Sequence, residues 1–165
     1  MSTLYVDNLQ PNLGSQVEIP NLKPLAGSVV QFKYAQVLNN TSSQTNNTAT
    51  YVAATDYSIT ITPKYADSLL VVSGKIGFYV TGGATPYAFA SVFRDGVDVS
   101  SSSYRNGYMQ GDIHVGQVMP FGCVLVSGST SSTTLDFRFR LGGGGATLHI
   151  VQASDKLMKV MEIAQ

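Results

Sequence analysis

Residues 134–141 alternate apolar and polar side chains almost without exception. The apolar members, which an extended chain turns to one face, are Leu135, Phe137, Phe139 and Leu141. The charged members, which it turns to the opposite face, are Asp136, Arg138 and Arg140. This period of two predicts a β-strand with one buried face. Because a slip of one residue would turn the charges inward, this segment fixes the register of its sheet.

Several other segments carry the same strand signature, and none shows convincing helical periodicity. Residues 58–62 alternate cleanly and stop at Pro63, and residues 28–38 predict a strand with Val30, Phe32 and Tyr34 on one face. In the longer segment 69–80, the residues that share one face are Leu70, Val72, Ile76, Phe78 and Val80. Lys75 falls on the other face.

Turn-forming residues and polar loops separate these predicted strands. Asp95-Gly96 lies between two β-forming runs and predicts a tight hairpin, because both turn residues need positive φ. Residues 39–50 and 100–112 are polar and are predicted to be loops, while 113–126 is a strand region in which Pro120 and Gly122 mark an edge or bulge. The last segment, 157–163, is apolar on both faces, which is typical of a central strand or a subunit interface.

Together these segments predict an all-β domain of about eight or nine strands over residues 28–165, with turns at roughly 8–14-residue spacing. We expect an antiparallel β-sandwich or jelly roll, with a closed barrel as the alternative. The pattern does not rank the order of the strands.

Residues 1–27 form a separate unit that we expect to be an extended N-terminal arm. Turn-forming residues interrupt it every few positions: Pro11, Gly14, Pro20, Pro24 and Gly27. Between them lie apolar residues too few to build a core, namely Leu4, Val6, Leu9, Val17, Ile19 and Leu22. A sparsely charged, strand-forming arm of this kind is typical of a segment that docks on another protein.

The composition argues against several classes of function. Only 12% of the 165 residues are charged, and ten basic residues balance ten acidic ones, so a basic surface for nucleic acid is not expected. A neutral surface also repels its own copies weakly. No apolar run is long enough to span a membrane, and no secretory signal is visible. The single cysteine, Cys123, excludes an intrachain disulfide and is expected to be a small buried residue.

Catalytic chemistry finds little support. Asp112 and His114 would share a strand face, but no third metal ligand lies nearby, and nothing orients Cys123 with His114 as a nucleophile pair. The run 142–145 of four glycines lacks the following helix and the lysine of a phosphate loop. We therefore expect no enzyme, no metal and no cofactor.

The remaining recognition candidates lie in the segment 100–112. It contains Tyr104, Arg105, Asn106 and Tyr108, which combine large contact area with polar tips and suit neutral sugars. The alternative is that these side chains merely cover one end of the sandwich.

The chain resembles short structural proteins of tailed bacteriophages, notably those of cyanobacteria and marine bacteria. The resemblance rests on Leu22-Lys23-Pro24-Leu25-Ala26-Gly27-Ser28-Val29-Val30-Gln31, the strand 58–63, the strand 69–73, the hairpin 94–96 and the ending 161–164. It implies a homotrimeric fibre or spike component with a jelly roll like that of tumour necrosis factor. The N-terminal arm would contact other virion proteins, and the distal domain would contact host polysaccharide.

The resemblance also implies a location in the virion, assembled in the reducing host cytoplasm, where disulfides are rare. Two alternatives stay open. One is a capsid, neck or baseplate decoration or adaptor protein without receptor binding. The other is a polysaccharide-degrading enzyme, which would need paired carboxylates; the acidic residues available, such as Asp112, Asp136, Asp155 and Glu162, are expected mostly in turns or on outward strand positions.

Overall fold

The chain folds into two antiparallel β-sheets that pack face to face. The computed structural model describes residues 24–37, 44–82, 87–99, 107–110, 117–142, 145–150 and 156–165. The first sheet contains β1 (Val29–Val37), β2 (Gln44–Asn46), β4 (Leu69–Thr81), β8 (Gln117–Val126), β10 (Thr147–Ile150) and β11 (Lys156–Ile163). The second sheet contains β3 (Val52–Ile61), β5 (Tyr87–Arg94), β6 (Val97–Asp98), β7 (Gly107–Gln110) and β9 (Thr133–Leu141).

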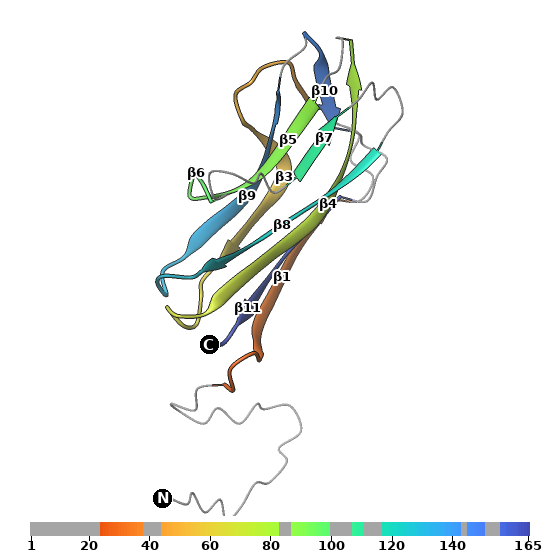
Figure 1. Cartoon of the computed structure of the whole chain (residues 1–165). Helices are drawn as coiled ribbons and strands as arrows, with labels where there is room; N and C mark the ends of the chain where they lie inside the picture. The colour runs from red at the N-terminus through yellow and green to blue at the C-terminus, as the bar shows by residue number, and fades with distance from the viewer. Residues whose placement is uncertain are drawn as a thin grey trace, which may run out of the picture.

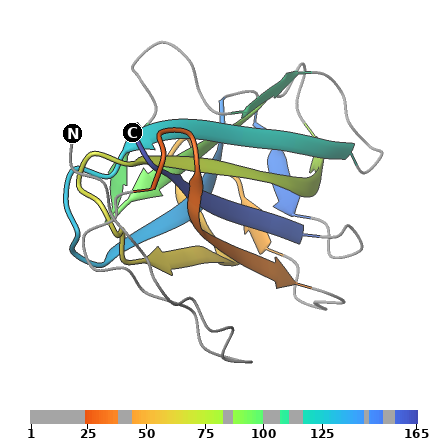
Figure 2. The same cartoon turned by 90° about the horizontal axis from the view of Figure 1, so that it is seen from below.

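The strand order is that of a jelly roll. In the first sheet β1 pairs with β11, and β2 pairs with β10. Both β11 and β10 pair with one edge of β4, and β8 pairs with the other edge of β4. In the second sheet the order is β3, β9, β5, followed by β6 and β7 on the free edge of β5. Along the chain, β1–β2, β3, β4, β5–β7, β8, β9 and β10–β11 alternate between the two sheets. Figure 1 shows the sandwich along its strands, and Figure 2 shows β8, β4, β11 and β1 side by side in one layer.

The predicted sandwich is therefore confirmed, and the closed barrel is excluded by the presence of two separate sheets. In β9 the burial alternates from end to end, with the predicted residues inside. In β4 the predicted inward residues are all buried, and Lys75 is exposed. The hairpin between β5 and β6 turns at Asp95 and Gly96, whose φ values are 49° and 83°.

Three predictions about segments need correction. The segments 39–50 and 100–112, predicted to be loops, contain the short strands β2 and β7. Short polar strands carry no clear hydrophobic period, so the described part of the chain has more strands than predicted. The strand predicted at 58–62 begins earlier, at Val52, because a bulge at Asp56 (φ 66°) joins two strand pieces. The bulge turns both Ala54 and Tyr57 inward.

Buried Asn46 explains why β2 forms in a polar segment. Its side-chain amide donates to the carbonyl oxygens of Thr50 at 2.9 Å and Phe139 at 3.1 Å. Its side-chain oxygen accepts hydrogen bonds from the backbone N–H and the hydroxyl of Thr48. Since a buried polar side chain must find partners, this one side chain ties β2 to β9 and shapes the turn that follows.

The core centres on Phe137. Its ring lies 4.3 Å from the ring of Phe121 and 5.6 Å from that of Tyr57, measured between centroids. The hydroxyl of Tyr57 donates to the carbonyl oxygen of Lys75 at 3.2 Å, which satisfies its polar end. Gly74 on β4 makes room for this cluster, because a Cβ there would collide with the Phe121 ring and the Leu157 carbonyl oxygen.

Candidate functional site

The structure tests few of the predicted site residues. Tyr104, Arg105 and Asn106 lie outside the described residues, and so do the six apolar arm residues predicted as a virion anchor, Leu4 to Leu22. Tyr108 belongs to β7, where its backbone pairs with Phe89, so it lies on a strand rather than in the loop that was predicted. Receptor contact by these residues stays a prediction.

The structure describes few of the residues that were considered for catalysis. Within these ranges, no group of three or more His, Cys, Asp or Glu side chains could hold a metal ion. Asp112 and His114 lie outside the ranges. Burial, together with the nearby Asp98 carboxylate, raises the pKa of the Cys123 thiol to about 11, so the thiolate that a nucleophile requires is scarce. No helix in the described part of the chain is long and apolar enough to cross a membrane.

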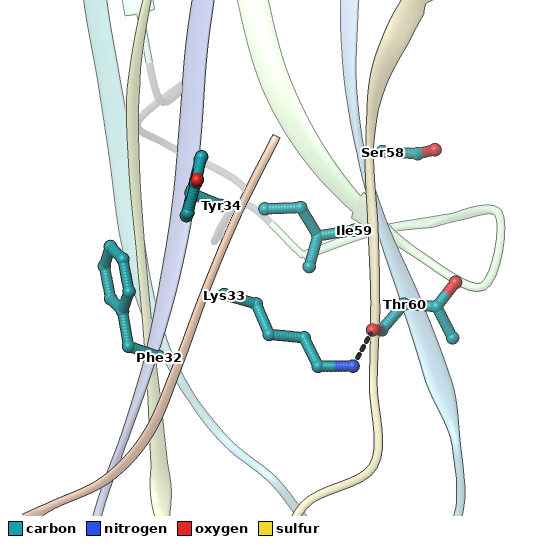
Figure 3. A pocket seen from close by; sticks show the side chains of 6 residues that line it. All are labelled: Phe32, Lys33, Tyr34, Ser58, Ile59 and Thr60. Atoms are coloured by element: carbon teal, nitrogen blue, oxygen red, sulfur yellow. Dashed lines mark hydrogen bonds between the residues drawn. The ribbon is translucent and has the colours of Figure 1, made fainter. Parts of the chain in front are cut away.

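A groove of about 410 Å³ runs between β1 and β3 and is open to solvent. Figure 3 shows that Lys33 crosses it, and the Lys33 ammonium donates to the carbonyl oxygen of Thr60 at 2.9 Å. Gln31 spans the same seam and donates to the carbonyl oxygen of Thr62 at 2.8 Å. In Figure 3 the Phe32 and Tyr34 rings lie on the side of β1 away from β3. The groove is therefore a seam closed by side chains, with few groups left to hold a ligand.

A buried carboxylate lies at the end of the sandwich where β1 begins and β11 ends. Glu162 has no exposed surface, although the sequence suggested a turn or outward position, so this prediction was wrong. Its side chain accepts hydrogen bonds from the backbone N–H groups of Lys64 and Tyr65, at 2.8 Å and 3.0 Å, and from the hydroxyl of Ser68 at 2.7 Å. It also accepts from the Gln31 amide at 2.5 Å.

These bonds determine the charge of Glu162. Burial by itself raises the pKa of a carboxyl group, but here the hydrogen bonds outweigh it and lower the pKa of Glu162 below its usual range. The carboxylate is therefore ionised near neutrality and joins β11, β1 and the β3–β4 turn at one end. With one carboxylate held by structural donors, it is not arranged as half of a glycosidase pair.

The outer face of the second sheet is covered by arginines. The Arg138 guanidinium lies 4.3 Å from the centre of the Phe93 ring and is paired with Asp136 at 2.6 Å. The Arg140 guanidinium lies 4.5 Å from the centre of the Phe89 ring and 5.1 Å from that of Tyr51. Phe89 and Phe93 are buried as a result, and this face offers a polar surface to solvent.

The outer face of the first sheet is different. Directly paired residues on neighbouring antiparallel strands point to the same face. One such row consists of Val29, Ile163, Leu69 and Val126. The adjacent row consists of Phe32, Met161, Val71 and Val124. We call these eight residues the outer apolar rows.

The outer apolar rows are open to solvent at both margins of the sheet. Val29 and Phe32 on β1 are 57% and 51% exposed, and Val124 and Val126 on β8 are 60% and 56% exposed. The four residues between them, on β11 and β4, are partly buried. Sequence periodicity did not single out this surface, because it assigned Phe32 to a face without showing whether that face met the core.

Comparisons with known proteins give no family. No protein-family model and no curated protein matches the sequence. Among solved structures, the chain is similar to a protein of infectious bursal disease virus, Gx strain, with 15% identity and a TM-score of 0.42, over 97% of this chain and 42% of that chain. A chain of the T13 particle of the same virus gives 14% identity and a TM-score of 0.48, over 92% of this chain and 41% of that chain.

Eiger, a tumour necrosis factor from S. frugiperda, gives 8% identity and a TM-score of 0.40, over 81% of this chain and 94% of that chain. The chain thus spans about two fifths of the viral chains that it resembles. The jelly-roll assignment rests on the strand order described above, and these distant likenesses add nothing on activity.

Proposed function

We propose that this protein is a non-enzymatic structural component of a virion, a homotrimeric fibre or spike subunit of a tailed bacteriophage. One observation carries the proposal: the residues that follow the N-terminal arm lie beside Ala164, at one end of the domain. The backbone N–H of Gly27 donates to the carbonyl oxygen of Ala164 at 2.8 Å, and the N–H of Ala164 donates to that of Ser28 at 3.0 Å. Figure 1 shows this turn beside the C-terminus, below the strands.

This arrangement suits a module with an attachment end and a free end. Residues 1–27 would then leave the attachment end, which the Glu162 hydrogen bonds hold rigid, and would contact other virion proteins. The opposite end would be presented to the host surface. The neutral charge and the sequence resemblance to phage structural proteins point the same way. The rival role, a decoration or adaptor protein of the capsid, neck or baseplate, uses the same attachment end but requires no host contact.

Removal of residues 1–23 tests the attachment role, because it leaves the turn from Pro24 to Ser28 in place. We expect the shortened protein to fold with an unchanged melting temperature and to be lost from purified particles, as followed by immunoblot. The full-length chain, expressed in the same way, is the control. Incorporation of the shortened protein at the full-length level would contradict an anchoring arm.

The second test concerns host contact. We expect Tyr104→Ala together with Tyr108→Ala to reduce binding of the purified protein to host envelope polysaccharide about tenfold or more, since loss of aromatic anchors costs roughly 2 kcal/mol or more. Val97→Ala, on the exposed β6 hairpin, is the control. If the wild-type protein does not bind the polysaccharide but is found in particles, the decoration or adaptor role is correct instead.

A further inference from the structure

We infer that three side chains of the first sheet close the free edge of β3 and so prevent it from pairing with a strand of a second copy. Within the described residues β3 pairs only with β9, so its other edge faces away from the sheet. The unpaired backbone groups of such an edge are a template onto which another chain can add a strand. The side chains that occupy this edge are those of Gln31, Lys33 and Gln44.

The sequence of β3 makes an open edge hazardous. The six residues 57–62 have the sequence Tyr-Ser-Ile-Thr-Ile-Thr, in which none is charged and none is a proline. Short segments with high β propensity and low charge are those that pair most readily with copies of themselves. The chain has equal numbers of acidic and basic residues, so net charge does not keep its copies apart. Protection of this edge must therefore come from the structure.

Two of the three side chains come from β1. The Lys33 ammonium donates to the carbonyl oxygen of Thr60 at 2.9 Å, and Figure 3 shows the side chain crossing to β3. The Gln31 amide donates to the carbonyl oxygen of Thr62, the residue after β3, at 2.8 Å. Because these two threonines are two positions apart, both carbonyl groups point away from β9. An added strand would have to displace both side chains to reach these acceptors.

The third side chain comes from β2 and imitates an added strand. The amide of Gln44 donates to the carbonyl oxygen of Ala53 at 2.6 Å and accepts a hydrogen bond from the backbone N–H of Thr55 at 2.9 Å. It therefore occupies one acceptor and one donor, as a peptide group of a paired strand does. With the two side chains from β1, it covers β3 on both sides of the bulge at Asp56.

The other sheet edges of the described chain are protected by different means. There β8 pairs only with β4, and it contains Pro120, which has no N–H to give to an added strand. The edge of β5 is covered by β6 and β7, of two and four residues, and such short edge strands offer few pairing groups. Since β3 has ten residues and no proline, it has neither protection and depends on the three side chains.

The test removes two of these side chains and keeps Gln31, which also contacts the buried carboxylate. The uncapped variant carries Lys33→Ala and Gln44→Ala. The control carries Lys64→Ala and Gln165→Ala, which remove the same residue types at exposed positions outside β3. Light scattering over a range of concentrations measures the mass of each full-length protein, and thermal unfolding checks its fold. We expect the control to keep the wild-type mass, and the uncapped variant to associate beyond it, about tenfold more strongly, because its freed backbone groups pair with a second copy.

Addition of Thr60→Lys to the uncapped variant locates the contact. This lysine lies on β3, and it returns the net charge from −1 to the wild-type value of 0, so it cannot act by general repulsion. A lysine on an edge strand opposes pairing with a copy, and we expect it to restore the wild-type mass. Association that this lysine leaves unchanged would place the contact elsewhere and overturn the inference.

An uncapped variant that keeps the wild-type mass at every concentration would also overturn the inference. If this variant does not fold, Lys33→Ala alone is compared with Lys64→Ala, and the same two outcomes decide. Every variant is measured against the wild type, whatever the oligomeric state of the wild type. A wild-type protein that is not a trimer would therefore contradict the proposed function and leave this inference in place.

Discussion

Replacement of Phe137 by Asp should leave the chain without a cooperative fold. Phe137 is fully buried, and its ring contacts those of Phe121 and Tyr57 between the two sheets. Loss of a buried phenylalanine costs about 3–5 kcal/mol, and an unpaired buried carboxylate adds several more. The total is comparable to the whole stability of a typical domain, about 5–15 kcal/mol. Circular dichroism and thermal unfolding would show an absent or non-cooperative transition.

Two controls isolate the cause. Phe137→Leu keeps an apolar side chain at the same place and should fold, with a loss of about 1–2 kcal/mol. Arg138→Ser, at the next position, changes the outward face and should cost only about 1 kcal/mol, because it removes the contact with Phe93 and the bond to Asp136. Similar losses for Phe137→Asp and Arg138→Ser would mean that the inward and outward faces of β9 have been assigned wrongly.

Glu162→Gln should lower the free energy of unfolding at pH 7 by about 2–4 kcal/mol. Both carboxylate oxygens of Glu162 accept hydrogen bonds, from donors on Gln31, Lys64, Tyr65 and Ser68. Glutamine has nearly the same size but turns an NH₂ group toward one set of these donors, which leaves a buried donor unpaired. Denaturant unfolding measures the difference, and Ser68→Ala, which removes one donor, should cost about half as much.

The same pair of proteins gives a prediction of pH dependence. The folded state lowers the pKa of Glu162 below its ordinary value of 4.5, so the folded state binds this proton less readily than the unfolded state. The stabilisation is therefore complete above about pH 4.5 and is lost as the pH falls through the lower, folded pKa. The stability difference between wild type and Glu162→Gln should shrink in that acidic range. A difference that stays constant from pH 7 to pH 3 would contradict an ionised, hydrogen-bonded Glu162.

The sequence predicted the position of β11 better than the environment of its residue Glu162. The pattern of β11 predicted an apolar strand at the centre of a sheet or at a subunit interface, and the structure places this strand between β1 and β4. It did not reveal that Glu162, on the inward side of the same strand, is buried. Burial of a carboxylate depends on donors supplied by residues 64–68 and by Gln31, which are distant in the sequence. No local pattern in β11 contains that information.

The sequence by itself determined the class of fold, the inward face of β4 and β9, and the hairpin at Asp95 and Gly96. These features follow from a period of two and from backbone conformations that few residues accept, and both are local properties of the chain. Only the tertiary structure decided the strand order and brought the outer apolar rows together. Each row takes one residue from each of β1, β11, β4 and β8. Pairing between strands far apart in the sequence is set by how the two sheets share a common core, and an alternating pattern in one strand cannot specify its neighbour.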